Sequence, residues 1–416
     1  MGLHSITYLS KSLKEQKLAR TKQKLEMQLL ELEQKHNLIM NIASIAKDRK
    51  FRVVISGGGT GGHIFPAIAI ANSIKINYPN TEILFVGAHG RMEMQKVPEA
   101  GYTIKGLRIS GMQRGSFWKN ILFPFKLVYS IIQAYFIISK FKPDVAVGVG
   151  GYASGPLLYV ATKKNIPTLI QEQNSFPGIT NKLLAEKVDK ICVAYDGMKK
   201  YFPSKKIMLT GNPVRNNIQD IKITKEQAYQ FFSLQINKPV LLIIGGSLGA
   251  KAINNSIRGN LELLIENKIQ VIWQTGSEYF EKVKNKTEDY AKNGIHVFEF
   301  IKDMDYAYAA ADIIVSRAGA IALSEITLVG KPAIIVPSPY VAEDHQTKNA
   351  HKLVDQNAAV LVREKEVQNT LGHVIVNLMH DSAKQQQIRD NLKKLAIYDS
   401  AKIIADEVML LANKDK

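Results

Sequence analysis

Residues 51–66, FRVVISGGGTGGHIFP, place a short apolar run directly before a glycine-rich turn and the start of a helix. The run 51–56 has the length and the β-branched content of a buried strand. The glycines between 57 and 62 let the backbone approach a ligand closely. Pro66 is favoured in a first helical turn, so we expect the helix to open there. The stretch predicts the strand, turn and helix from which α/β folds are built.

Outward from this unit, apolar runs of strand length alternate with longer helical patterns. They span 51–56, 82–86, 144–149, 167–171 and 190–194 in the first half, and 239–244, 269–273, 295–298, 312–315 and 333–336 in the second. Such alternation predicts parallel sheets covered by helices on both faces. We therefore expect two doubly wound, Rossmann-like domains in tandem. The length of 416 residues agrees with two domains, because it exceeds the chain length that one hydrophobic core usually supports.

The pattern divides the chain into four segments. Residues 1–49 carry Leu18, Leu25, Leu32 and Ile39 at intervals of seven, which predicts an amphipathic helix or short coiled coil. Its role is unknown, and a solvated tail is favoured over a specific pairing role. We assign 50–215 to the first domain, 216–396 to the second, and 397–416 to a helix that packs back on the first. Two such domains bring the carboxyl ends of both sheets to a shared cleft, where we expect the active site.

Composition narrows the function classes. Hydrophobic residues make up 46% and charged residues 22%, as in globular proteins rather than disordered or fibrous ones. The single cysteine, Cys192, excludes an intrachain disulfide and a cysteine-built metal site. Lys and Arg outnumber Asp and Glu by 55 to 37, and the net charge of +18 favours phosphates, nucleic acid or anionic lipid as partners. Because no basic patch with interleaved aromatics is visible, we expect no nucleic-acid partner.

The sequence also bears on membranes and targeting. The lysines of residues 11–24 are not followed by an apolar core, so we expect no secretory signal. The most apolar stretch, 121–141, is interrupted by Pro124, Lys126 and Lys140, which argues against a bilayer-spanning helix. We therefore expect an intracellular protein with no transmembrane segment.

The turn 57–63 could hold an anion or a sugar oxygen at the following helix start. It is neither a dinucleotide fingerprint nor a P-loop, because the acidic ribose ligand and the Gly-Lys-Ser/Thr ending are missing. His63 at its mouth is placed to act as a base near neutral pH, although a lone histidine is often structural.

Two further turns follow strands of the second domain. The turn 245–250, GGSLGA, matches the Gly-x-Ser-x-Gly elbow of hydrolases, with Ser247 as nucleophile, or holds a diphosphate at a helix start. In 317–325, RAGAIALSE, small residues open a helix, and Glu325 could accept two sugar hydroxyls or simply favour the helix dipole. No cluster of histidines or carboxylates has convincing metal-ligand spacing, so we expect no metal site.

Together these segments resemble the family of peptidoglycan N-acetylglucosaminyltransferases that convert lipid I, undecaprenyl-diphospho-muramoyl-pentapeptide, to lipid II. The resemblance runs from Phe51 to the C-terminus and rests on 57–66, 150–156 (GGYASGP), 171–174 (QEQN), 211–215 (GNPVR), 245–250, 317–325 and 343–350 (EDHQTKNA). Residues 1–49 depart from the family pattern. The resemblance implies an inverting GT-B enzyme that uses UDP-N-acetylglucosamine without a cofactor or catalytic metal. Its first domain would hold the acceptor lipid and its second the nucleotide sugar; a serine hydrolase and a UDP-sugar epimerase remain the alternatives.

The resemblance also implies roles for single residues. His63 would be the base, and Glu172 is the second candidate unless its carboxylate only orients neighbouring loops. Ile301 would offer a backbone contact to uracil, and Gln346 a contact to the transferred sugar. The other implied donor contacts are Thr60, Gly61, Gly62, Asn174, Arg215, Ser247, Ala320, Ile321, Ala322, Leu323, Ser324 and Glu325.

The acceptor of this family remains in the bilayer, which implies contact with an anionic membrane surface. The stretch 117–126, FWKNILFPFK, mixes aromatic, aliphatic and basic residues as interfacial helices do, although an ordinary buried helix is the alternative. The candidate membrane or acceptor residues are Trp118, Ile121, Leu122, Phe125 and Lys126. The resemblance implies a peripheral place on the cytoplasmic face of the bacterial inner membrane, with the cell-wall and division machinery as further partners.

Overall fold

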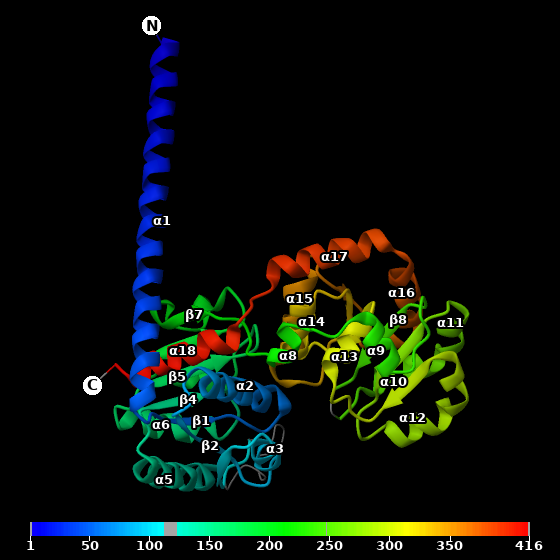
Figure 1. Ribbon diagram of the computed structural model, residues 1–416, viewed down its shortest axis with the longest axis horizontal. Coiled ribbons are helices and arrows are strands. Elements are labelled where there is room, and N and C mark those ends of the chain that lie inside the picture. Colours follow the sequence, from blue (N-terminus) through cyan, green and yellow to red (C-terminus); the bar gives the residue numbers. More distant parts are fainter. Residues whose placement is uncertain (1, 112–122, 247, 415–416) are drawn as a thin grey trace.

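The computed structural model describes residues 2–111, 123–246 and 248–414, which form two domains around two parallel sheets (Figure 1). The first sheet has the strand order β3-β2-β1-β4-β5-β6-β7, and the second has the order β10-β9-β8-β11-β12-β13. In each sheet the order reverses beside the first strand, at β1/β4 and at β8/β11, which is where doubly wound folds bind ligands. The predicted pair of Rossmann-like domains is confirmed.

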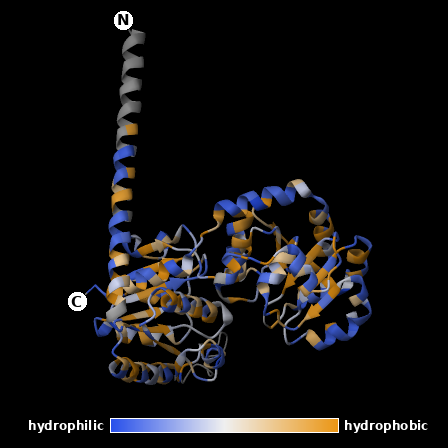
Figure 2. Cartoon of the chain, in the orientation of Figure 1, coloured by the Kyte–Doolittle hydropathy of each residue, from blue (hydrophilic) through white to orange (hydrophobic). Residues whose placement is uncertain are grey.

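The first sheet lies between two layers of helices. Its strands are β1 (Arg52–Ser56), β2 (Glu82–Ala88), β3 (Thr103–Leu107), β4 (Val145–Gly148), β5 (Thr168–Glu172), β6 (Lys190–Val193) and β7 (Ile207–Leu209). The five predicted strands are present because runs of Val, Ile and Leu are buried on both faces, as the colouring of the strands in Figure 2 illustrates. The sequence does not predict β3 and β7, which are edge strands with exposed residues; Lys and Gly interrupt the apolar residues of β3, and the apolar run of β7 is only three residues long.

The helices of this domain cover opposite faces of the sheet. One layer contains α1 (Gly2–Asp48), α2 (Gly61–Asn77), α3 (Glu93–Glu99) and α18 (Ser400–Ala412). The other contains α5 (Phe123–Phe141), α6 (Ser154–Lys163) and α7 (Ile179–Leu184). Short 3₁₀ turns, η1 (Met198–Lys200) and η2 (Ser204–Lys206), precede β7.

The start of α2 differs from the expectation that the helix opens at Pro66. The Thr60 carbonyl accepts from the N–H groups of His63, at 3.1 Å, and Ile64, at 3.2 Å, so the helix begins at Gly61. Pro66 lies inside the helix, where it can donate no backbone hydrogen bond. Because α2 starts within the glycine-rich turn, His63 lies on its first turn.

The second domain repeats the architecture. Its strands are β8 (Val240–Ile244), β9 (Gln270–Gln274), β10 (Ile295–Phe298), β11 (Ile313–Ser316), β12 (Ala333–Ile335) and β13 (Val360–Leu361). Its helices are α8 (Asn216–Gln219), α9 (Lys225–Phe231), α10 (Lys251–Gly259), α11 (Leu261–Glu266), α12 (Phe280–Thr287), η3 (Glu288–Asn293), α13 (Met304–Ala310), α14 (Ala320–Val329), η4 (Ala342–Asp344), α15 (His345–Val354), α16 (Val367–His380) and α17 (Ser382–Leu395). The five predicted strands are present, and only the short β13 was missed. The core includes Val214, which the expected boundary at 215 would place in the first domain.

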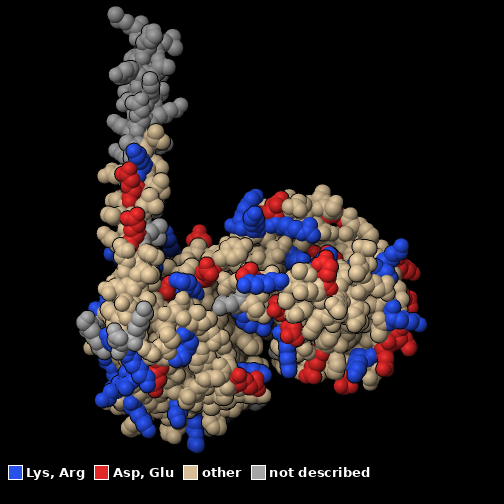
Figure 3. Space-filling model, viewed as in Figure 1, with Lys and Arg blue, Asp and Glu red and all other residues tan. Residues whose placement is uncertain are grey.

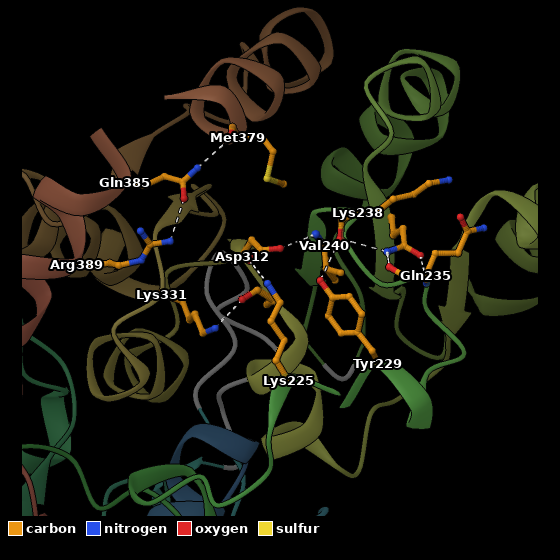
Figure 4. A network of polar contacts seen from close by, with 12 residues as sticks. Lys225, Tyr229, Gln235, Lys238, Val240, Asp312, Lys331, Met379, Gln385 and Arg389 are labelled. Carbon is orange, nitrogen blue, oxygen red and sulfur yellow. Dashed lines mark hydrogen bonds and ion pairs between the residues drawn. The ribbon is translucent and has the colours of Figure 1, made fainter. Parts of the chain in front are cut away.

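At the amino end of each sheet, an aspartate accepts a hydrogen bond from the first N–H group of a central strand. Asp312, directly before β11, accepts from the Val240 N–H at 2.9 Å and pairs with Lys225 Nζ at 2.6 Å (Figure 4). Asp144, directly before β4, accepts in the same way from the Arg52 N–H at 2.8 Å. The first N–H groups of the central strands are thus satisfied within each domain. The opposite, carboxyl ends carry the turns that the sequence singles out.

Both ends of the chain pack on the first domain. In α18, Ile404, Val408 and Met409 are buried in the core cluster that contains β1 and α2. The last turns of α1 join the same cluster through Ile42 and Ala46. Lys35, two turns earlier, pairs with Glu407 of α18, and the part of α1 before it extends away from the body as a single helix (Figure 1).

Candidate active site

The carboxyl ends of the two sheets meet at the junction between the domains, where a linker amide joins their loops. Asn212 Oδ1 accepts from Gln171 Nε2 at 3.0 Å. Its Nδ2 donates to the Gln173 carbonyl at 3.1 Å and to Ser324 Oγ at 2.9 Å. Gln171 and Gln173 flank the end of β5, whereas Ser324 lies on α14. Asn212 therefore fixes a loop of the first domain against a helix start of the second.

The glycine-rich turn after β1 is held open by a buried carboxylate. Glu93 accepts from the N–H groups of Gly59 and Ala88, each at 2.9 Å. A Cβ on Gly58 would lie 2.2 Å from this carboxylate, and Gly59 has φ +86°, so the turn requires glycine at both positions. No side chain caps the following helix start, which leaves the N–H groups of Gly61 and Gly62 available to a ligand.

Gln173 fixes the tautomer of His63. The Gln173 Nε2 donates to the Val149 carbonyl at 2.8 Å, which turns its Oε1 toward His63 Nδ1 at 3.0 Å. We therefore assign the proton to Nδ1, so that Nε2 presents a lone pair. Gly150, with φ +89°, passes against the ring, and a Cβ there would lie 2.9 Å from Nδ1. The ring is thus held in one orientation, with Nε2 as the nitrogen that can accept a proton.

Burial lowers the pKa of His63 from its ordinary value of 6.5. The nearby carboxylate of Glu172 and the hydrogen bond that His63 donates to Gln173 oppose this effect, and His345 of the second domain reinforces it. The imidazole is consequently neutral near pH 7, as a proton acceptor must be.

Glu172, the second candidate base, is surrounded by donors from its own loop. Its Oε1 accepts from the backbone N–H of Asn174 at 3.0 Å and from Asn174 Nδ2 at 3.2 Å. Its Oε2 accepts from the Gly178 N–H at 3.1 Å and from Asn181 Nδ2 at 2.8 Å. A carboxylate that accepts four hydrogen bonds from its loop and from the start of α7 holds that loop in one conformation. This geometry favours the loop-orienting alternative for Glu172.

The turn after β11 presents an uncapped helix start. Gly319 is extended and has no side chain to cap α14, so the first N–H groups of Ala320, Ile321 and Ala322 are free to meet an anion. Leu323 is 1% exposed and belongs to the core, so only its backbone can face a ligand. Ser324 Oγ is already engaged with Asn212 and the Ala320 carbonyl.

Glu325 is buried and has two donors as neighbours, one from α13 and one from the linker between the domains. Tyr308 donates its hydroxyl to Oε2 at 2.9 Å, and Arg215 Nη2 lies 3.5 Å from Oε1. Burial raises the pKa of Glu325 above its ordinary value, whereas Arg215 and Tyr308 lower it. The carboxylate is held between the buried Tyr308 and the partly exposed Arg215 of the linker.

Other implied donor residues lie around the same junction. The Ile301 N–H donates to Gln274 Oε1 at 3.0 Å, which leaves the Ile301 carbonyl for a nucleobase. Gln346, on the first turn of α15, accepts from the Ser338 N–H at 2.8 Å, so its amide nitrogen can face a sugar. Ser247 lies outside the described residues, but Gly246 and Gly249 beside it have φ +84° and +90°.

Sequence reasoning missed four residues that position this site. They are Gln173, Asn212, Tyr308 and Asn349. Three of them, Gln173, Asn212 and Asn349, lie in the quoted segments QEQN, GNPVR and EDHQTKNA, so the motifs include these residues. The motifs do not show which way each side chain points, and so they do not predict its partner.

The candidate membrane residues are only partly described. Phe125 and Lys126 are exposed on α5, whereas Trp118, Ile121 and Leu122 lie outside the described residues. No helix within the described ranges has the length and hydropathy that crossing a membrane requires.

Metal ligands do not gather in the described part of the chain. No group of three or more His, Cys, Asp or Glu residues there could hold an ion. Asp303 and Asp305, spaced as Asp-x-Asp at the start of α13, belong to no such group among the described residues.

Comparisons with known proteins agree on one family. Residues 53–193 match the N-terminal domain, and residues 240–404 the C-terminal domain, of glycosyltransferase family 28. The UDP-N-acetylglucosamine–N-acetylmuramyl-(pentapeptide) pyrophosphoryl-undecaprenol N-acetylglucosamine transferase of Flavobacterium psychrophilum is 49% identical over 367 residues, covering 88% of this chain and 99% of that relative. The crystal structure of MurG from Acinetobacter baumannii has TM-score 0.70 and 29% identity, covering 86% of this chain and 99% of that one.

A likeness to epimerases is limited to the fold. The UDP-GlcNAc 2-epimerase from Neisseria meningitidis, solved bound to UDP-GlcNAc, has TM-score 0.59 and 18% identity, covering 88% of this chain and 100% of that one.

Two parallel-sheet domains with helix starts at their junction are the GT-B architecture, and the glycosyltransferase family 28 matches over both domains make the chain a glycosyltransferase of the GT-B class. Within that class the sequence identity is decisive. The chain belongs to the family of UDP-N-acetylglucosamine–N-acetylmuramyl-(pentapeptide) pyrophosphoryl-undecaprenol N-acetylglucosamine transferases.

Proposed function

We propose that this chain performs the reaction of its family by a single inverting displacement at the junction between its domains. It transfers N-acetylglucosamine from UDP-N-acetylglucosamine to the 4-hydroxyl of the muramoyl sugar of lipid I, giving lipid II. The observation that carries the mechanism is the orientation of His63, whose Nε2 is left free by the Gln173 bond to Nδ1.

In the proposed step, His63 Nε2 takes the proton of the 4-hydroxyl as that oxygen attacks the anomeric carbon. The new bond joins the acceptor oxygen to this carbon, and the bond to the diphosphate breaks on the opposite face. The electron pair leaves with UDP, so the configuration inverts and the linkage is β-1,4. Glu172 supports the loop that carries Gln173 and takes no proton in this scheme.

The leaving diphosphate needs positive charge as it departs. The helix starts at Gly61–Gly62 and Ala320–Ala322 offer free N–H groups from both domains, and Arg215 adds a guanidinium. Ser247 would join them from the turn after β8. These groups can do what a divalent cation does in other transferases, so the proposed mechanism uses no metal and no cofactor.

The rest of the donor would lie along the second domain. Glu325 suits the two ribose hydroxyls, because a carboxylate can accept from both. The Ile301 carbonyl suits the N–H of the uracil edge. Gln346 suits the transferred sugar, and Thr60 and Asn174 would close over it from the first domain. Leu323 contributes only its backbone N–H, since its side chain is in the core.

The acceptor lipid requires a membrane-facing surface, for which we propose the outer face of α5. Ser130, Ala134 and Ile138 are buried at intervals of four, so the helix presents its opposite face to solvent. That face exposes Phe125, Val128, Tyr129, Ile132, Tyr135 and Phe136. Basic side chains gather at this end of the first domain (Figure 3), and Lys164 Nζ lies 4.1 Å from the Tyr135 ring centroid.

An apolar face with basic neighbours is typical of binding to an anionic membrane surface. We accordingly place the enzyme peripherally on the cytoplasmic face of the bacterial inner membrane. There it would meet the cell-wall and division machinery, and the proposal includes no nucleic-acid partner.

The test uses radiolabelled UDP-N-acetylglucosamine with purified full-length protein, with and without a lipid I analogue. Label should enter lipid only when acceptor is present, and a chelator should not diminish it. Strict dependence on added divalent metal would overturn the metal-free mechanism, and donor consumption without acceptor would indicate an epimerase. Ser247→Ala should retain measurable transfer, whereas a serine hydrolase would lose essentially all turnover.

A further inference from the structure

The N-terminal half of α15 contacts the first domain through one fully buried amide. Asn349 Oδ1 accepts from the backbone N–H of Ser175 at 2.9 Å and from Ser175 Oγ at 3.0 Å. Its Nδ2 donates to Asn174 Oδ1 at 3.1 Å and to the Ala318 carbonyl at 3.4 Å. Three of these four bonds cross between the domains, so one side chain ties the loop after β5 to the second domain.

A second contact lies one residue away on the same helix. Lys348 Nζ lies 3.5 Å from the ring centroid of Phe176, and Lys182 Nζ of the first domain lies 3.9 Å from it. Tyr201 supports the ring edge-on, with a centroid distance of 5.2 Å. Cations on an aromatic ring add a modest attraction that does not depend on hydrogen-bond geometry. Lys348 and Asn349 therefore contact two consecutive residues of the first domain, Phe176 and Ser175.

The loop that Lys348 and Asn349 contact, which follows β5, also orients the proposed base, His63. Gln173, whose Oε1 holds His63 Nδ1, precedes Asn174 and Ser175 directly. Ala318, the partner of Asn349 in its own domain, precedes the Gly319 start of α14. Asn349 thus stands between the loop that sets the direction of His63 and the turn that would hold the donor diphosphate.

We propose that Ser175 and Asn349 form an interdomain clasp that positions His63 opposite the donor turn. The inference rests on the proposed function and names two positioning residues for it. The clasp favours the one arrangement of the two domains in which base and donor face each other. Without it the domains sample other arrangements, and the competent fraction falls. Uridine diphosphate should bind nearly as before, because its proposed contacts lie on the second domain and the linker, apart from the N–H groups of Gly61 and Gly62.

The experiment compares Ser175→Ala, Asn349→Ala and the double variant, in the full-length chain, with Ser204→Ala as an exposed control. The readouts are kcat with a lipid I analogue and the dissociation constant of UDP by calorimetry. Ser175→Ala should lower kcat about fivefold, the factor expected for one net hydrogen bond, while UDP affinity stays within about twofold. The double variant should lose no more than Asn349→Ala alone, since both changes break one contact.

The clasp is overturned if folded Ser175→Ala keeps the kcat of the wild type, if the two losses multiply, or if UDP affinity falls in parallel with kcat. Should Asn349→Ala fail to fold, Lys348→Met takes its place, and it should lower kcat with UDP affinity unchanged. A wild-type protein that transfers no label at all would refute the proposed function itself, a result distinct from any of these.

Discussion

Replacing Gln173 by leucine tests the orientation of the proposed base most directly. The substitution removes the acceptor 3.0 Å from His63 Nδ1 and keeps a side chain of similar size. A net hydrogen bond contributes about 1 kcal/mol, so the ratio of Nδ1-protonated to Nε2-protonated imidazole should fall about fivefold. We expect kcat/KM at neutral pH to fall by up to this factor, because only the Nδ1-protonated tautomer offers Nε2 to the acceptor hydroxyl.

The assay measures label transfer to the lipid I analogue and needs two reference variants. His63→Ala removes the base and should cost about 100- to 10,000-fold. Adding Gln173→Leu to His63→Ala should then change nothing further, because Gln173 acts through the imidazole. Gln386→Leu, on the exposed face of α17, is the matched control for a glutamine exchange and should be silent.

Stability is followed separately by thermal unfolding, since the Val149 carbonyl loses the Gln173 donor. Folded Gln173→Leu that turns over at the wild-type rate would contradict the role of Gln173 in orienting His63. A double variant slower than His63→Ala alone would contradict it too, because Gln173 would then act independently of the base.

Four further outcomes are expected. Because burial lowers the pKa of His63 below 6.5, the acid limb of the kcat/KM profile should lie below pH 6.5. An acid limb above pH 6.5 would contradict the assignment of His63 as the base. Glu325→Gln should weaken UDP binding about tenfold in calorimetry, since one acceptor oxygen becomes a donor, and unchanged affinity would remove Glu325 from the ribose site. Phe136→Glu, at a position 66% exposed, should lower binding to anionic vesicles at least about tenfold in co-sedimentation without affecting the melting temperature, and undiminished binding would discount α5. Met409→Ala should lower the free energy of unfolding by about 2–5 kcal/mol, and a smaller loss would mean that α18 contributes little to the core.

The sequence predicted the parts of the fold that periodicity and turn chemistry control. Nine of the ten predicted strands are almost wholly buried apolar runs, and their burial follows from helices on both faces; the exception is β10, an edge strand in which only Ile295 is buried. The missed strands β3, β7 and β13 lie at or near sheet edges, where exposure removes the apolar signal. The helix start at Gly61 was misplaced because the Pro66 preference is local, whereas the Thr60 carbonyl, which starts the helix, depends on the conformation of the turn.

For the candidate site, the sequence predicts which segments contribute, and the roles of single residues stay predictions. Glu172 is predicted as a second base or as a carboxylate that orients loops, and its neighbour Gln173, which the sequence does not single out, is the residue that contacts His63. The difference lies in the donors from Asn174, Gly178 and Asn181, which gather around one carboxylate only when the loop is folded. Contacts between domains, such as Asn349 with Ser175, join residues 174 positions apart and leave no periodic trace.

The course of the polypeptide through its two domains has a consequence for biosynthesis. The chain leaves the first domain after β7 and returns only with α18, whose Val408 and Met409 complete that domain's core. Because a ribosome delivers residues in order, this apolar surface stays uncovered while the whole second domain is being translated. The second domain can fold on emerging, whereas the core of the first is completed only when the last helix has left the ribosome.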